Sequence, residues 1–316
     1  MSWNESMIGD LSGRNVVITG ANSGVGFEAA RELVRHGAHV VMACRNMTAA
    51  ERAQSTIAGD DSSGTTEIVE LDLSDLDSVA RCAAGLLKDG RSIDTLVNNA
   101  GVMGGPETFT AQGFEMQMGT NHLGHFALTA RLWPLIVAAE NPRVLSLSSI
   151  ASRNGSLTAA MTRDTLVAPN PYKEMAVYSN TKQATLLFSQ ELSRRAQAAG
   201  LNVSSIGVHP GVSSTNLLSR QLKGRGLGVL APVATGFGKV LFQSAKGGAR
   251  PTVMAATDSG VGSGDFVGPS QLGQIRGTPK VLTLYSQGRD EATAKKLWEL
   301  SEQVVEVPFD VSASAS

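Results

Sequence analysis

The sequence predicts a single doubly wound α/β domain with a mostly parallel sheet of about seven strands. Short apolar runs alternate with helical patterns along the chain, as consecutive strand–helix–strand units require. The first apolar run, residues 16–18, leads through three glycines into a helical stretch, and a second run follows at 40–43. The length of 316 residues suits one large domain.

The glycine-rich turn that follows the first predicted strand indicates a dinucleotide site. Glycine tolerates positive φ and lets a ligand approach the backbone closely. The helix that follows begins with unpaired N–H groups and the positive end of its dipole, which together suit a pyrophosphate. A tight turn without a ligand is the alternative. The residues expected to bind are Gly20, Asn22, Ser23, Gly24, Val25 and Gly26.

Composition places the chain among globular proteins. Hydrophobic residues make up 42% and charged residues 17%, and the net charge of −1 gives no electrostatic case for nucleic acid. Cys44 and Cys82 have no metal or redox spacing, so we expect buried thiols. Residues 1–10 do not resemble a signal peptide, and no apolar run is long enough for a transmembrane segment. We therefore expect a cytoplasmic protein.

The remaining elements follow in alternation. Leu76, Val79, Ala83 and Leu87 are predicted to share the buried face of one helix. The predicted strands are 67–71, 93–97, 142–149, 202–208 and 266–267, and the predicted helices are 48–57, 74–88, 119–132, 178–195, 247–256 and 292–304, with 268–280 a loop.

Three motifs together resemble the short-chain dehydrogenase/reductase family, in its retinol-dehydrogenase-like and protochlorophyllide-reductase-like subgroup. They are T-G-x-x-x-G-x-G at 19–26, N-N-A-G at 98–101, and Tyr178 four residues before Lys182 after a strand that ends in two serines. The resemblance covers residues 14–280 and implies a Rossmann fold. Ser149 and Tyr178 are 29 residues apart, farther than is usual in the family. We expect the extra segment, 154–174, at the substrate entrance.

The resemblance assigns the catalytic roles to Asn121, Ser149, Tyr178 and Lys182. A free tyrosine has a pKa near ~10, but an adjacent ammonium and the positive nicotinamide favour its phenolate, so Tyr178 would exchange a proton with the substrate oxygen. Ser149, rather than Ser148, would polarise that oxygen. Lys182 would also bond the nicotinamide ribose. Asn121 would distort its helix and hold a water near the lysine.

Arg45, at the end of the second predicted strand, favours NADP (NADPH) over NAD. Enzymes that prefer NAD usually place an acidic residue there, whereas a guanidinium suits a 2′-phosphate. A solvated surface arginine is the alternative, and Asp72 could equally be a loop residue. The family resemblance implies further cofactor contacts from Asp72, Leu73, Asn99, Ala100, Gly101, Tyr178, Lys182, Pro210, Gly211, Val212 and Thr215.

The leucine- and glycine-rich stretch 216–243 suggests a lid, placed around 213–245, over an apolar substrate. A core helix or contact with a membrane surface are the alternatives. The C-terminal segment 268–316 is expected to be variable. His122 and His125 have no acidic or sulfur partner in the motif, so we expect packed histidines and no metal. Family analogy allows a homo-oligomer.

The expected function is NADP(H)-dependent interconversion of an alcohol and a ketone or aldehyde on a fairly apolar small molecule. Two alternatives on the same fold are a non-catalytic NADP(H)-binding sensor and a sugar epimerase or dehydratase. The four expected catalytic residues argue against a sensor, and the glycine spacing argues against an epimerase.

Overall fold

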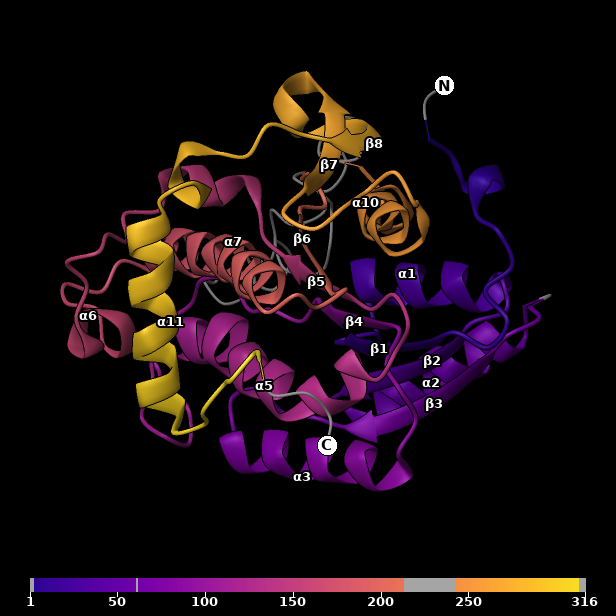
Figure 1. Cartoon of the computed structure of the whole chain (residues 1–316), viewed down its shortest axis with the longest axis horizontal. Helices are drawn as coiled ribbons and strands as arrows, with labels where there is room; N and C mark the ends of the chain where they lie inside the picture. Colours follow the sequence, from indigo (N-terminus) through magenta and orange to yellow (C-terminus); the bar gives the residue numbers. More distant parts are fainter. Residues whose placement is uncertain (1–2, 61, 213–242, 313–316) are drawn as a thin grey trace, which may run out of the picture.

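A computed structural model describes residues 3–60, 62–212 and 243–312 of the chain. Over these residues the fold is one α/β domain built on an eight-stranded sheet in the order β3-β2-β1-β4-β5-β6-β7-β8 (Figure 1). The strands are β1 (Asn15–Thr19), β2 (His39–Cys44), β3 (Thr65–Glu70), β4 (Thr95–Asn98), β5 (Arg143–Leu147), β6 (Ser204–Val208), β7 (Phe266–Gln271) and β8 (Arg276–Val281).

The helices alternate with the strands as the apolar pattern predicts. They are α1 (Gly24–Arg35), α2 (Met47–Ala58), α3 (Leu76–Asp89), α4 (Met116–Met118), α5 (Gly124–Val137), α6 (Arg163–Val167), α7 (Glu174–Ala198), α10 (Ala245–Thr257) and α11 (Glu291–Val305). Short 3-10 turns are η1 (Glu5–Met7), η3 (Ile150–Asn154), η5 (Leu272–Gln274) and η6 (Ser286–Gly288), and a π turn, η2 (Gly119–Leu123), leads into α5.

Two apolar clusters cover the two faces of the sheet. Successive residues of β1 point to opposite faces, so Val16 and Ile18 join the cluster under α1, α2 and α10, and Val17 joins the one under α3, α5 and α7. Because β1 is followed by β2 on one side and by β4 on the other, the chain order reverses at β1. In open α/β sheets, ligands bind at the carboxyl ends of the strands beside such a switch point.

The C-terminal helix lies over the α5 and α7 layer (Figure 1). Trp298 of α11 stacks on Phe188 of α7 and meets Phe126 of α5 edge to face. Phe309, beyond the helix, packs on the same aromatic group. Among the described residues, none of the helices is both long and apolar enough to cross a bilayer.

Two expectations about the fold were wrong. The sheet has an eighth strand where a loop was expected, because Arg276–Val281 pairs antiparallel with β7. Pro279 is tolerated in β8 because β8 lies at the edge of the sheet. In α3 the buried leucine is Leu86, whereas Leu87 is 39% exposed. The buried face is centred on Val79 and Ala83, and it includes the residue three positions after Ala83 rather than the residue four positions after it.

Candidate active site

The glycine turn between β1 and α1 forms an open cradle at the switch point. Gly20 has φ +67°, a conformation that favours glycine. A Cβ at Gly26 would lie 2.3 Å from Asn99 Nδ2 and 2.7 Å from the Gly20 carbonyl oxygen, so only a hydrogen fits there. Ser23 precedes α1 without a side-chain hydrogen bond to it, which leaves amides of the first turn open to an anion. This cradle fits a pyrophosphate.

Thr19 ties the cradle to the N-N-A-G run after β4. Its hydroxyl oxygen accepts hydrogen bonds from the amides of Asn99 and Ala100, each at 2.9 Å. The Asn99 side-chain amide donates to the Thr19 carbonyl at 2.7 Å. This anchoring role of Thr19 was not predicted from the sequence, although its place beside the first glycine of the motif was a signal for it.

Asn121 lies in the π turn, where the amide of Gly124 bonds the carbonyl five residues back instead of four. The Asn121 side chain accepts from the Val102 amide at 2.7 Å and donates to the Val102 carbonyl at 2.9 Å. It also donates to the Thr181 hydroxyl at 3.0 Å. The structure thus has the expected helix distortion, and Asn121 joins the loop after β4 to the middle of α7.

Lys182 lies buried beneath the same loop. Its Nζ donates to the Leu147 carbonyl at 2.9 Å and lies 3.5 Å from the position that a Cβ on Gly101 would take. Burial lowers the pKa of the ammonium to about 8. Nζ lies 5.8 Å from the centroid of the Tyr178 ring, one helical turn away on α7.

The two serines at the end of β5 point in different directions. Ser148 is buried, and its hydroxyl donates to the Lys182 carbonyl at 2.7 Å. Ser149 is partly exposed, and its side chain acts on the Tyr178 phenol in the direction that lowers the pKa of the phenol. Strand alternation therefore directs Ser149, not Ser148, toward the tyrosine. The structure brings Ser149 and Tyr178 together, with Lys182 one helical turn along α7 and next to Gly101.

The expected lowering of the Tyr178 pKa depends on the positive nicotinamide as well as on Lys182, and the protein residues alone do not produce it. Burial raises the pKa of the phenol, and Ser149 opposes that rise only in part. Burial also weakens the positive charge on Lys182, because it favours the neutral amine. The phenol of the ligand-free chain is therefore protonated at neutral pH.

Arg45 and Asp72 meet at the rim, at the ends of β2 and β3. The Arg45 side chain is 65% exposed, and its guanidinium lies 3.8 Å from the Asp72 carboxylate. Asp72 also accepts from the amide and hydroxyl of Ser74 at 2.9 and 2.6 Å, so a loop role accounts for its side chain. Leu73 is buried.

The Pro210-Gly211 turn follows β6 at the same edge of the sheet. Gly211 has φ +71°, and a Cβ there would lie 2.3 Å from the Ile275 carbonyl oxygen. The Pro210 carbonyl accepts from Gln243, and the Val212 amide donates to Ile275 at 2.9 Å. Thr215 and nearly all of the expected lid around 213–245 lie outside the described residues.

His122 and His125 are both buried and bonded to protein. His122 Nε2 lies 2.8 Å from the Ser301 hydroxyl, and His125 Nε2 lies 2.9 Å from the Thr19 hydroxyl. Within the described ranges, no three His, Cys, Asp or Glu side chains are grouped to hold a metal ion. The sequence pattern predicted packed histidines, and the contact between His125 and Thr19 was not predicted.

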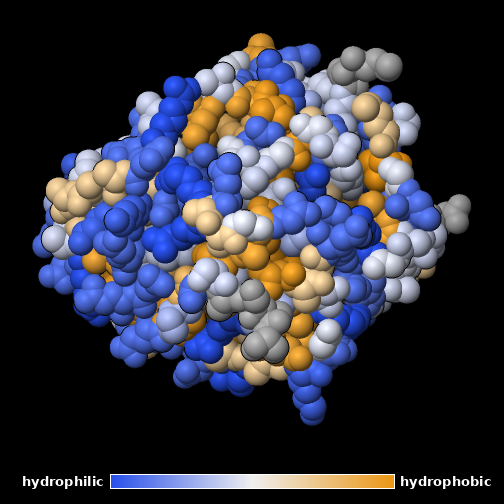
Figure 2. All heavy atoms as spheres, in the orientation of Figure 1, coloured by the Kyte–Doolittle hydropathy of each residue, from blue (hydrophilic) through white to orange (hydrophobic). Residues whose placement is uncertain are grey.

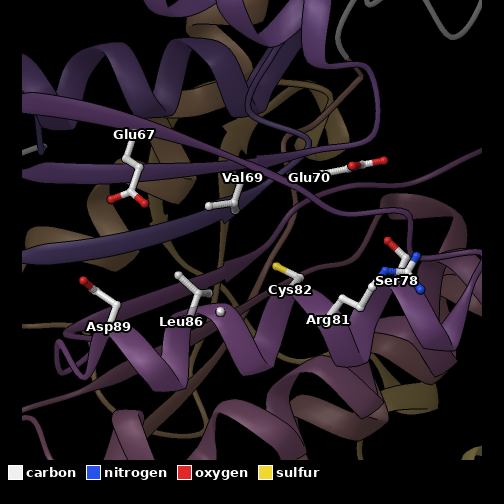
Figure 3. Close-up of a pocket in the computed structure, with 9 residues that line it drawn as sticks. Glu67, Val69, Glu70, Ser78, Arg81, Cys82, Leu86 and Asp89 are labelled. Carbon is white, nitrogen blue, oxygen red and sulfur yellow. The ribbon is translucent and has the colours of Figure 1, made fainter.

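A cavity of about 410 Å³ opens between β3 and α3, away from these residues (Figure 3). Val69 of β3 lies across the cavity from Cys82 and Leu86 of α3, while Glu67 and Asp89 lie toward one end. Neither Ser149 nor Tyr178 lines it. Its position and lining separate it from the candidate active site.

The fold and these contacts define a dinucleotide-dependent oxidoreductase site, and comparison with known proteins gives the family. The family model described as short chain dehydrogenase matches residues 14–161. Retinol dehydrogenase 13 of Homo sapiens is 34% identical over 300 residues, which cover 93% of this chain and 85% of that protein. Retinol dehydrogenase 14 of Mus musculus is 37% identical over 308 residues, covering 94% and 87%.

The chain belongs to the short-chain dehydrogenase/reductase family, in its retinol-dehydrogenase-like subgroup. A crystal structure of an uncharacterised protein from Mycobacterium Paratuberculosis superposes with a TM-score of 0.79 at 37% identity, covering 98% of this chain and 99% of that one. The family acts on alcohol and carbonyl groups with a nicotinamide cofactor, which agrees with the cradle and the tyrosine–lysine pair.

Proposed function

We propose that the protein is an NADP(H)-dependent oxidoreductase that interconverts an alcohol and a ketone or aldehyde on a fairly apolar small molecule. The observation that carries the proposal is the grouping of Ser149, Tyr178 and Lys182, with Lys182 Nζ next to Gly101 in the loop after β4. When bound, the nicotinamide supplies or accepts the hydride. The chain itself must orient the substrate oxygen and move one proton.

Carbonyl reduction suits the site as it stands. Tyr178 donates its proton to the carbonyl oxygen, and the burial that raises its pKa keeps that proton in place until transfer. The Ser149 hydroxyl donates a hydrogen bond to the same oxygen and stabilises its growing negative charge. In alcohol oxidation, the Lys182 ammonium and a positive nicotinamide must together outweigh the burial of the phenolate.

The cofactor preference rests on Arg45, whose exposed guanidinium follows β2, where enzymes that prefer NAD usually have an acidic residue. Arg45→Ala is expected to lower kcat/KM for NADPH at least tenfold and to leave NADH little changed, because a charge-assisted contact contributes about 1.5–3 kcal/mol. Arg52→Ala, at an exposed position on α2, is the matched control. An equal decrease of kcat/KM with both cofactors, or a preference of the wild-type protein for NADH, would contradict the proposed preference for NADP.

An apolar substrate is supported by the retinol dehydrogenases among the relatives and by the leucine-rich composition of 216–243. Figure 2 shows apolar side chains gathered in patches between hydrophilic ones on the face in view. Among the described residues, Met175, one turn before Tyr178, and Leu272 are large hydrophobic side chains that remain 44% and 56% exposed.

The function is tested by measuring, from its absorbance, how fast the reduced nicotinamide is consumed. We expect turnover with aldehydes and ketones and a kcat/KM that rises with chain length, because each buried methylene adds about 0.8 kcal/mol. Cofactor binding without turnover of any compound in the series would favour a sensor. Conversion of a sugar into its epimer, with the nicotinamide regenerated and its absorbance unchanged overall, would favour an epimerase.

Cytoplasmic localisation and a homo-oligomer are further proposals. Pairing through α5 and α7, as in some family members, would have to accommodate α11, which packs on both helices. Sedimentation of the full chain and fractionation of cells that express it test these two points.

A further inference from the structure

His125 connects two parts of the candidate active site from the first turn of α5. The side chain is 4% exposed. Its Nδ1 lies 3.0 Å from the Asn121 carbonyl oxygen, and its Nε2 lies 2.9 Å from the Thr19 hydroxyl. Both ring nitrogens are therefore in use, and neither faces solvent.

The partners determine where the protons are. A carbonyl oxygen only accepts, so Nδ1 must carry the ring proton and donate it to Asn121. Nε2 then accepts from Thr19, whose other acceptor, the Val97 carbonyl, is farther away at 3.4 Å. Burial lowers the pKa of His125 to about 4, with a smaller contribution from the charge on Lys182, so the ring is neutral at neutral pH.

Each end of the imidazole reaches a different segment of the site. Thr19 holds the amides of Asn99 and Ala100, and so fixes the loop that ends β4 against the glycine turn. At the other end, the Asn121 carbonyl belongs to the π turn. The ring therefore connects the π turn to the end of β1. His125 and Thr19 are 106 residues apart in the sequence.

We propose that His125 is a positioning residue. By donating a hydrogen bond to the Asn121 carbonyl, it holds the π turn in the position that the proton-transfer site requires. The proposal rests on the function given above. A shift of the turn would move the Asn121 amide, whose oxygen lies 3.2 Å from the Cβ position of Gly101, where Lys182 Nζ also converges. Small misplacements of such groups slow the chemical step more than they weaken binding.

Two substitutions separate the two ends of the ring. His125→Asn keeps an N–H donor near the Nδ1 position and loses the contact with Thr19. His125→Gln keeps an amide near the Nε2 position and loses the bond to Asn121. We expect kcat of His125→Asn within about threefold of wild type, and kcat of His125→Gln lower by at least about tenfold with KM for NADPH nearly unchanged.

His122 provides the matched control in the same turn. It is equally buried, but its Nε2 donates to Ser301, whose hydroxyl in turn donates to the Leu297 carbonyl. His122→Asn and His122→Gln are expected to lower Tm without the kcat difference between the two amides. Nitrogen NMR of the cofactor-free protein should show the Nδ1–H tautomer for His125 and the Nε2–H tautomer for His122.

An Nε2–H tautomer at His125 would overturn the proposal independently of any activity. A kcat of His125→Gln equal to that of wild type would also overturn it. The same holds if the decrease in kcat of the two His125 variants is proportional to their decrease in Tm. If wild-type protein turns over no carbonyl compound, the proposed function fails, whereas the tautomer measurement still decides whether the ring bridges the two segments.

Discussion

Replacing Lys182 by methionine should make the cofactor-free protein more stable and far less active. Burial lowers the pKa of Lys182 from 10.5 to about 8. At about 1.4 kcal/mol for each pKa unit, holding the charged form in the folded state costs about 3 kcal/mol at neutral pH. Methionine fills the same space without charge but loses the bond to the Leu147 carbonyl, about 1 kcal/mol. The expected net gain is about 2 kcal/mol.

The pH dependence of that gain identifies its cause. Because the pKa of Lys182 is lower in the folded state, the unfolded chain binds more protons between pH 8 and 10.5, so wild-type stability rises with pH across this window. The penalty is complete below pH 8 and absent above 10.5. In urea unfolding without cofactor, the free energy of unfolding of Lys182→Met should exceed that of wild type at neutral pH. The difference should disappear by about pH 10. A variant that is less stable at neutral pH, or a gap that does not change with pH, would refute the reasoning.

The remaining predictions concern the cradle and the thiols. Gly26→Ala should destabilise the chain by about 1–3 kcal/mol and weaken cofactor binding, because its Cβ would overlap Asn99. Gly85→Ala, with no atom within 4 Å of its Cβ position, should stabilise α3 by up to about 1 kcal/mol; thermal unfolding and fluorescence titration compare the two. Burial raises the pKa of Cys44 and Cys82 to about 11, so a thiol reagent should label neither in the native protein and both in denaturant. Rapid native labelling would contradict that burial.

Much of the fold could be predicted because its signals are local. The apolar run before Gly20 and the helical pattern after Gly26 predicted β1 and α1 without any knowledge of distant contacts. Strand β8 could not be predicted in this way. Its proline and glycine residues oppose a strand locally, and only pairing with β7 at an edge of the sheet makes the conformation favourable.

In the candidate site, too, the features with a local sequence signal could be predicted, and those that depend on distant contacts could not. The family resemblance brought Ser149, Tyr178 and Lys182 to attention and favoured Ser149 over Ser148, and strand alternation required the two serines to point in opposite directions. Spacing could not predict that burial raises the Tyr178 pKa, because desolvation depends on elements packed from elsewhere in the chain. The contact between His125 and Thr19 was missed for the same reason.

The most direct test of the proposed chemistry is the rate of hydride transfer in a single turnover by Tyr178→Phe. The substitution removes one hydroxyl and leaves the glycine cradle, Arg45 and Lys182 in place. The account predicts a transfer rate at least 10²-fold below wild type, as expected for loss of a positioned acid, with NADPH affinity little changed. A variant that transfers hydride at the wild-type rate would contradict the assignment of Tyr178 as the proton donor.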